Sequence, residues 1–141
     1  MPAILWAFAF LMLLHEGVFM AQPIPTEINL HQKSRCLEVA FDDGVRYEYS
    51  CEFLRVYSPS AEVRGHGVGN EVLQLGKEHV NIVAIEPVGH YAVKLVFDDG
   101  HDSGLYSWDY LHTIGANQAL MWQQYLNKLE EAGHTRHTAD T

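Results

Sequence analysis

The sequence predicts an α+β fold: a small antiparallel sheet built from two related β-hairpins plus one or two further strands, packed with a long C-terminal helix. Two observations lead to this prediction. The tetrapeptide Phe-Asp-Asp-Gly occurs at residues 41–44 and again at 97–100, each time between stretches of alternating apolar and polar residues. Residues 116–133 place apolar side chains at helical spacing and stop at a glycine.

The first expected elements are a strand at residues 26–32 and the hairpin that follows it. A three-residue loop at 42–44 makes Phe41 face Val45 and collects the apolar side chains of both strands on one face. A two-residue loop would mix apolar and charged side chains on each face. We therefore expect a type I turn with Gly44 in the left-handed conformation.

The second hairpin follows an expected strand at residues 79–88 and carries one extra residue. A bulge near Ser103 and Gly104 would absorb this residue and bring Tyr106 to the place that Tyr49 holds in the first hairpin.

Each hairpin leads into a helix start. Ser50 and Ser107 are expected N-caps, and Glu52 and Asp109 fall in the first turn, where the helix dipole favours negative charge. The connection between residues 57 and 81 is rich in glycine and is expected to be irregular.

The paired aspartates have two readings. Aspartate favours tight turns because its side chain accepts hydrogen bonds from nearby backbone amides. A catalytic or metal-binding role would instead require a sheltered cleft. The turn position favours the structural reading for Asp42, Asp43, Asp98 and Asp99.

Composition limits the classes of partner. The 141-residue chain is 48% hydrophobic and 19% charged, which is typical of one globular domain. Its net charge of -9 disfavours nucleic acid and membrane surfaces as partners. Cys36 and Cys51 are too few for a disulfide framework or a zinc module, and we expect a cytoplasmic protein.

The N-terminus carries an apolar run at residues 2–14, too short to cross a bilayer comfortably. No basic residue precedes Lys33, and Phe19 is bulky where a signal-peptidase site needs a small residue. We interpret residues 1–21 as an extension outside the fold; a targeting segment is the alternative. Residues 22–133 then form a single domain, followed by a disordered tail at 134–141.

Two long stretches carry a resemblance to a known family. The sequence FDDGVRYEYSCEFLRVYSPSAEVRGHG, followed by NIVAIEPVGHYAVKLVFDDGHDSGLYSWDYL, resembles the gamma-butyrobetaine hydroxylase-like N-terminal domain family over about residues 24–133. The resemblance implies a stand-alone bacterial member of a family that is also found fused to iron oxygenases and to P-loop ATPases. The oxygenase domain of those fused relatives has no counterpart in this sequence.

Oxygenase-linked relatives carry a zinc site with the pattern Leu-Arg-x-x-Cys-x-Cys-x-x-Cys and a later histidine. In this sequence the three cysteine positions fall on Ser58, Ser60 and Val63, and His101 keeps the histidine position. Zinc requires about four sulfur, imidazole or carboxylate ligands. The sequence therefore gives no reason to transfer the zinc site.

The strongest candidate ligand- or partner-binding residues are Arg55, Arg64 and His66, which concentrate donors near a glycine-rich stretch of an acidic protein. A small anion or an acidic segment could bind there; alternatively, the arginines pair with nearby glutamates on a surface loop. His101 and Asp102, with the neighbouring carboxylates, are candidate ligands for iron or zinc, and a solvated histidine is the alternative.

We therefore expect a non-enzymatic accessory or binding module that docks a protein partner or a small ligand and requires no cofactor. The alternative function is a metal protein that uses His101 and its neighbours to hold iron or zinc in a redox or assembly role. An unknown hydrolase or transferase is the weakest hypothesis, because the sequence contains no nucleophile-histidine-acid signature.

Overall fold

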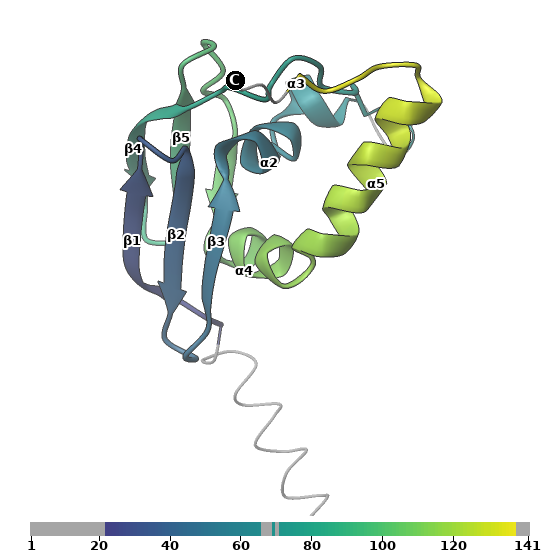
Figure 1. Cartoon of the computed structure of the whole chain (residues 1–141). Helices are drawn as coiled ribbons and strands as arrows, with labels where there is room; N and C mark the ends of the chain where they lie inside the picture. The colour runs from purple at the N-terminus through teal and green to yellow at the C-terminus, as the bar shows by residue number, and fades with distance from the viewer. Residues whose placement is uncertain (1–21, 66–68, 70, 138–141) are drawn as a thin grey trace, which may run out of the picture.

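The computed structural model describes residues 22–65, 69 and 71–137. In these residues, six strands form two three-stranded antiparallel sheets, with strand orders β1-β2-β3 and β4-β5-β6 (Figure 1). The strands are β1 Pro25–His31, β2 Cys36–Phe41, β3 Arg46–Ser50, β4 Ile82–Val88, β5 Ala92–Phe97 and β6 Leu105–Ser107. The helices are α2 Cys51–Val56, α3 Ala61–Arg64, α4 Trp108–Ala116 and α5 Gln118–Glu131. The α+β prediction is confirmed.

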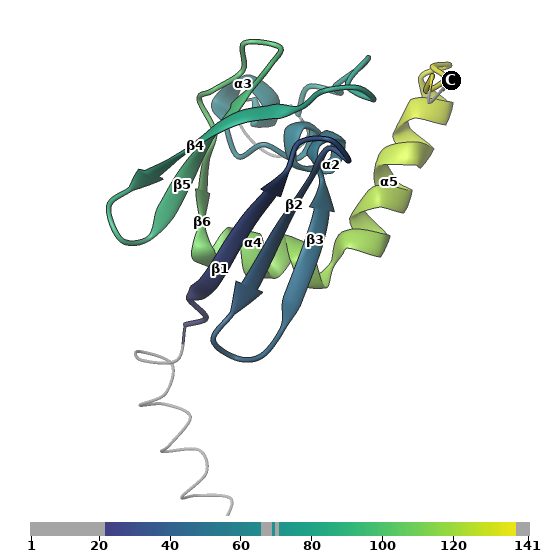
Figure 2. The same ribbon diagram turned by 60° about the vertical axis from the view of Figure 1, so that its left-hand side comes forward.

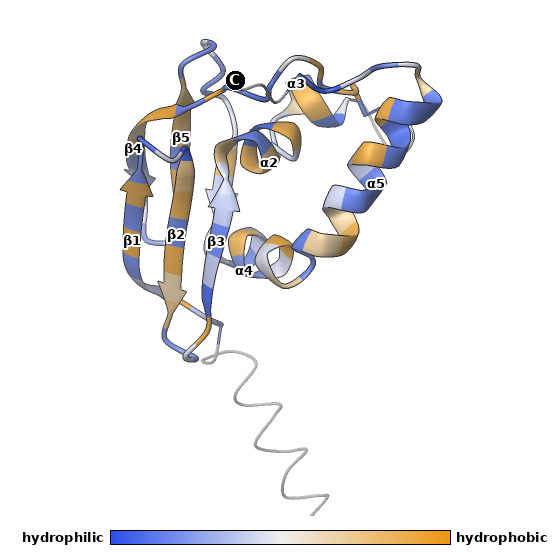
Figure 3. Ribbon diagram, viewed as in Figure 1, coloured by the Kyte–Doolittle hydropathy of each residue, from blue (hydrophilic) through white to orange (hydrophobic). Residues whose placement is uncertain are grey.

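The first hairpin has the predicted three-residue loop. The Phe41 amide donates to the Val45 carbonyl at 2.8 Å, and Gly44 has φ 91°. Leu37 pairs with Tyr49 and Val39 with Tyr47, so one face of the hairpin is apolar. β2 is the most continuously apolar strand of its sheet (Figure 3).

The second hairpin repeats this turn and then shifts register. The Phe97 amide donates to the His101 carbonyl at 3.0 Å, and Gly100 has φ 90°. Further along, Val93 pairs with Tyr106, which requires the one-residue bulge predicted near Gly104. Tyr106 thus occupies the place in this hairpin that Tyr49 holds in the first.

The strands divide into two sheets, whereas the sequence suggested one. Figure 2 shows the two sheets as distinct, with strands running in different directions. Their apolar faces meet in one core, in which Leu37, Tyr49, Leu95 and Tyr106 have no exposed surface. The hairpin pattern defines pairing within each half, but it contains no signal for pairing between halves.

Each half of the fold is a three-stranded sheet followed by a helix, and a matching pair of hydrogen bonds joins the two halves. Tyr49 donates its hydroxyl to the Leu111 carbonyl in α4 at 2.7 Å. Tyr106 donates to the Leu54 carbonyl in α2 at 2.5 Å. Each tyrosine therefore binds the helix that follows the other hairpin, and neither half satisfies its own buried groups alone.

The helix starts agree with prediction. Ser50 accepts from the Phe53 amide and Ser107 accepts from the Tyr110 amide, each at 3.0 Å. The C-terminal helical region is divided at Asn117 into α4 and α5. The short helix α3, capped by Ser60, lies in the connection that the sequence marked as irregular.

The C-terminal residues depart from expectation. The sequence favours disorder from residue 134, but Arg136 bonds to Glu52 at 2.8 Å and its guanidinium lies 5.0 Å from the Trp122 ring centroid. Glu52 is buried and needs such a partner. Residues 138–141 and the apolar run at 2–14 lie outside the described residues. Within the described part of the chain, no helix is both long and apolar enough to span a membrane.

Candidate functional site

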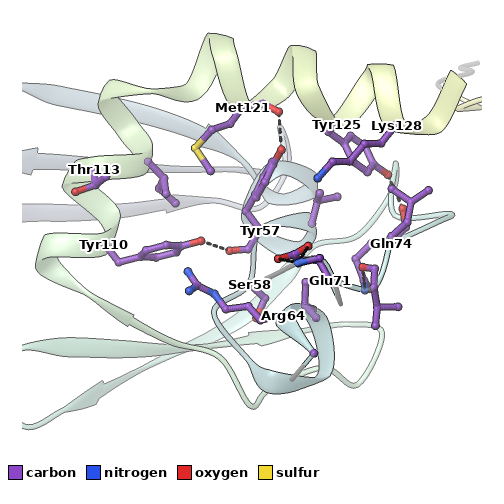
Figure 4. Close-up of a pocket in the computed structure, with 17 residues that line it drawn as sticks. Tyr57, Ser58, Arg64, Glu71, Gln74, Tyr110, Thr113, Met121, Tyr125 and Lys128 are labelled. Carbon is purple, nitrogen blue, oxygen red and sulfur yellow. Dashed lines mark hydrogen bonds between the residues drawn. The ribbon is translucent and has the colours of Figure 1, made fainter. Parts of the chain in front are cut away.

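A cavity of about 810 Å³ lies between the α2–α3 region and helices α4 and α5 (Figure 4). Its volume is in the range of small-molecule sites in proteins. Its walls combine apolar and aromatic side chains with a few charged groups. The aromatic, charged and threonine side chains of the lining include Tyr57, Arg64, Glu71, Tyr110, Thr113, Tyr125 and Lys128.

Three tyrosines hold the walls in place through hydrogen bonds to backbone carbonyls. Tyr57 donates to Met121 at 2.6 Å, and Tyr110 donates to the Tyr57 carbonyl at 2.5 Å. Tyr125 donates to the Gln74 carbonyl at 2.7 Å. Burial raises the pKa of Tyr125 to about 12, so this hydroxyl stays a donor at neutral pH. The rings therefore form fixed walls, while their hydroxyl protons are already engaged.

Two cations face this aromatic space. The Arg64 guanidinium carbon lies 5.1 Å from the Tyr110 ring centroid, within cation–π range. Lys128 reaches toward the cavity from α5 (Figure 4). Glu71, the acid in the lining, accepts two hydrogen bonds from the Gly69 amide, at 3.1 and 3.2 Å. Two cations and one carboxylate leave the cavity positive in a chain whose net charge is -9.

A second polar cluster lies under α3. His101 Nδ1 is 3.0 Å from a Glu62 carboxylate oxygen, and Nε2 is 2.8 Å from Ser58 Oγ. Because a carboxylate only accepts, Nδ1 carries the proton and Nε2 accepts from the serine hydroxyl. Burial, followed by the charge of Arg55, lowers the pKa of His101 and favours this neutral form.

The cluster has the atom order of a serine–histidine–acid triad, which the sequence analysis did not detect. Ser58 is only 1% exposed, and its Oγ also accepts from the Ser60 amide at 3.2 Å. A Cβ added at Gly104 would lie 2.4 Å from Ser58 Oγ, so the backbone closes over the hydroxyl. The arrangement holds the α2–α3 connection against the second hairpin. Ser58 is among the residues that line the cavity, but its low exposure and its hydrogen bonds leave it little room to meet a substrate.

These residues do not fit the zinc site of the oxygenase-linked relatives, in agreement with the sequence analysis. Ser58 and His101 occupy two of the four ligand positions and are bonded to each other. Ser60 bonds to Ser103 at 2.6 Å, and Val63 offers no ligand atom. Two hydroxyls and one imidazole are a poor donor set for zinc.

The paired aspartates have structural partners. Asp42 and Asp98 each exchange hydrogen bonds with the backbone of the chain before β1 or β4. Asp43 pairs with His112 at 2.8 Å, and Asp99 pairs with Arg55 at 2.9 Å. Burial raises the pKa of Asp99, but hydrogen bonds from Lys77, the His101 amide and Arg55 outweigh it and bring the pKa to about 2.

The structure separates the residues that the sequence analysis grouped as a binding site. Arg64 lines the cavity. Arg55 is buried between Asp99 and Gln74 and does not line it. His66 lies outside the described residues.

The candidate metal ligands are also separated by environment. His101 is buried with both ring nitrogens engaged, and Asp102 is exposed. Among residues 22–65, 69 and 71–137, no group of three His, Cys, Asp or Glu side chains could hold a metal ion. The metal hypothesis stays a prediction that metal analysis can test.

Sequence reasoning missed Lys128 and the tyrosine walls. The sequence analysis assigned residues 116–133 to a helix with apolar side chains at helical spacing, and Tyr125 on that helix is buried. The available signal was a lysine in the last turn of the same helix, close to the apolar face. The sequence does not show that α3 lies opposite this turn.

The comparison with protein-family patterns identifies one family. The sequence pattern described as "Gamma-butyrobetaine hydroxylase-like, N-terminal" matches residues 28–112. No curated protein matches the chain.

Three of the solved structures that are similar to this chain are between 41% and 57% identical to it. One solution NMR structure is 57% identical with a TM-score of 0.70, covering 81% of this chain and 85% of its own. A second is 48% identical with a TM-score of 0.72, covering 85% and 94%. A crystal structure from Acidithiobacillus ferrooxidans, described as a protein with unknown function of the DUF971 family, is 41% identical with a TM-score of 0.55, covering 65% and 92%.

Proposed function

The chain belongs to the gamma-butyrobetaine hydroxylase-like N-terminal domain family, and we propose that it is a non-enzymatic binding module whose ligand is a small molecule held in the α2–α5 cavity. The observation that carries the proposal is the cavity of about 810 Å³, which has aromatic walls and few polar groups. Binding sites for small molecules are typically concave and mostly apolar, with a few polar groups that orient the ligand.

Among the described residues, the groups that most resemble a catalytic set have partners within the protein, and this supports binding rather than catalysis. In the described residues, Ser58 of the serine–histidine–acid cluster is only 1% exposed although it lines the cavity, and the paired aspartates are engaged in turns and ion pairs. The tyrosine hydroxyls of the cavity walls donate to backbone carbonyls. General acid–base catalysis needs a group within reach of the substrate proton, and these groups already have partners.

The proposal includes the accessory role that the family resemblance implies. A domain that occurs beside unrelated enzymes is suited to supply binding rather than one fixed reaction. Unpaired cysteines are consistent with the cytoplasmic location expected from the sequence, since reducing compartments keep thiols free. Fractionation of the native cells, with detection of this protein in each fraction, tests the location.

Amide NMR with a small-molecule library tests the binding function. We expect hits to shift signals of cavity-lining residues and to remain chemically unchanged over hours. Thr113→Trp should abolish these shifts, because Thr113 is exposed and lines the cavity. Gln123→Trp is the matched control, since Gln123 is exposed on α5 and does not line the cavity.

Two results would contradict the proposal. Hits that shift residues elsewhere, with the same affinity for wild type and Thr113→Trp, would show that the cavity is not the binding site. Conversion of a hit to a product in the sample, lost with His101→Ala, would show an enzyme instead of a binding module.

A further inference from the structure

We propose that the cavity selects small organic anions, with the acidic group bound by Arg64 and Lys128 and an aromatic or apolar body packed against the tyrosine rings. The inference rests on the proposed binding function and specifies the chemical class of the ligand. Carboxylates and phosphates share the required negative charge and acceptor oxygens.

The ion-pair pattern of the protein carries the argument. The chain has nine lysines and arginines, all within the described residues. Five of them form ion pairs there: Arg46, Arg55, Lys77, Lys94 and Arg136. Of the other four, Arg64 and Lys128 line the same cavity, although they come from α3 and α5. The chain has twice as many aspartates and glutamates as lysines and arginines. Even so, these two cations have no carboxylate partner in the described residues, and both line the same aromatic cavity.

The local geometry keeps these cations available. Arg64 lies over the face of Tyr110, which orients the guanidinium and leaves it without a carboxylate partner in the described residues. Tyr110 itself is fixed because its hydroxyl donates to the Tyr57 carbonyl. Glu71 could compete for the cations, but its carboxylate accepts from the Gly69 amide, and it forms no ion pair with either cation among the described residues. An incoming anion therefore meets an oriented donor that no neighbouring carboxylate has neutralised.

The walls determine the rest of the ligand. The hydroxyl protons of Tyr57, Tyr110 and Tyr125 are donated to backbone carbonyls, so the rings present faces to the cavity. Val56, Val63, Ile114 and Met121 add apolar surface. A purely polar anion such as inorganic phosphate would leave these surfaces unfilled, whereas an aromatic acid fills them and displaces water from them. The cavity therefore matches an amphipathic anion better than an inorganic one.

Two fluorescent dyes with closely related aromatic bodies test the inference. 1-Anilinonaphthalene-8-sulfonate carries an anionic group, and N-phenyl-1-naphthylamine is its neutral counterpart. We expect both dyes to bind wild type in the cavity and both to be excluded by Thr113→Trp. Arg64→Gln/Lys128→Gln should weaken binding of the anionic dye about tenfold or more and binding of the neutral dye less than about twofold, because hydrogen bonds between charged groups are stronger than those between neutral groups.

The matched control is Lys33→Gln/Arg35→Gln. These two exposed cations also lack an ion pair in the described residues and do not line the cavity, so the total charge changes equally. An equal loss of affinity for the anionic dye in both double variants would overturn the inference, because the change in the protein's total charge would then explain the loss. Equal loss of both dyes in Arg64→Gln/Lys128→Gln would also overturn it, provided that circular dichroism shows a folded protein.

The same experiment separates this inference from the proposed function. If the neutral dye binds in the cavity and the anionic dye is insensitive to Arg64→Gln/Lys128→Gln, the anion preference is wrong and the binding function stands. If neither dye responds to Thr113→Trp, the cavity does not bind them and the proposed function fails as well.

Discussion

The imidazole at position 101 links two parts of the fold that are distant in sequence. It accepts from Ser58 at Nε2, which requires the neutral ring, and it donates to Glu62 from Nδ1. Burial and the positive charge of Arg55 lower the pKa of His101, while Glu62 and Asp99 act in the opposite direction. Protonation would end the bond from Ser58 and place a second positive charge near Arg55.

The free energy of unfolding should therefore depend on pH through His101. The unfolded chain binds a proton near the ordinary pKa of 6.5, and the folded protein binds it only at lower pH. Stability from this residue is complete above about pH 6.5 and is lost as pH falls toward the folded-state pKa. Urea titrations at several pH values should show this loss in wild type.

Two variants sharpen that test. His101→Gln should be less stable than wild type by about 1–3 kcal/mol at neutral pH and should lose this part of the pH dependence. His134→Gln, at an exposed position, should keep it. A pH profile of His101→Gln that parallels wild type would show that another group carries the effect.

The two cysteines should differ sharply in reactivity. Cys51 is fully buried, and burial raises its pKa to about 11, whereas Cys36 is half-buried. The thiolate is the reactive form, so Cys51 is both shielded and protonated at neutral pH. Iodoacetamide should modify Cys36 quickly and Cys51 only when the protein unfolds, and mass spectrometry measures both reactions. A single fast adduct in Cys36→Ser would contradict this assignment.

At the scale of elements, the hairpins were predictable because their signals are local. The Asp-Asp-Gly turns, the serine caps and the bulge near Gly104 all depend on neighbours in sequence. The division into two sheets and the opposition of α3 to α5 depend on contacts between distant segments. For this reason Arg64 was found as a candidate and Lys128 was not.

The turn glycines give an element-scale prediction. Gly44 and Gly100 have φ near 90°, and a Cβ added at either would meet nothing within 4 Å. Their substitution therefore tests backbone conformation without a steric clash. Gly44→Ala should lower the free energy of unfolding by about 1–2 kcal/mol, since residues with a Cβ disfavour this region. Denaturant unfolding measures the change.

Gly44→Asn is the matched control, because asparagine tolerates positive φ better than alanine. It should cost less than Gly44→Ala. Equal stability of Gly44→Ala and wild type would contradict the left-handed turn on which the hairpin register depends.

At the scale of the whole molecule, the two halves are joined by exchanged contacts. Tyr49 binds α4 and Tyr106 binds α2, and Asp43 reaches His112 in α4 while Asp99 reaches Arg55 in α2. The repeated sequence motif therefore marks two similar hairpins, and each hairpin contacts the helix that follows the other one. The sequence shows the repetition, but the crossing of its contacts appears only in three dimensions.

These crossed contacts predict a single cooperative unit. Native-state hydrogen exchange should give the same opening free energy for the most protected amides of β2 and β5, equal to the global free energy of unfolding. Tyr106→Phe should lower both by about 1–2 kcal/mol, because it leaves the buried Leu54 carbonyl without its donor. Loss of protection in β5 alone would show that the halves unfold separately.

Native mass spectrometry of the protein isolated gently from its own cells tests the central claim most directly, because it detects a bound small molecule and a bound metal in the same spectrum. The account predicts wild type with one small organic acid, retained by Gln123→Trp and absent from Thr113→Trp and from Arg64→Gln/Lys128→Gln. A stoichiometric iron or zinc adduct that disappears in His101→Ala, with no organic ligand in any variant, would contradict the account and support the metal-binding alternative.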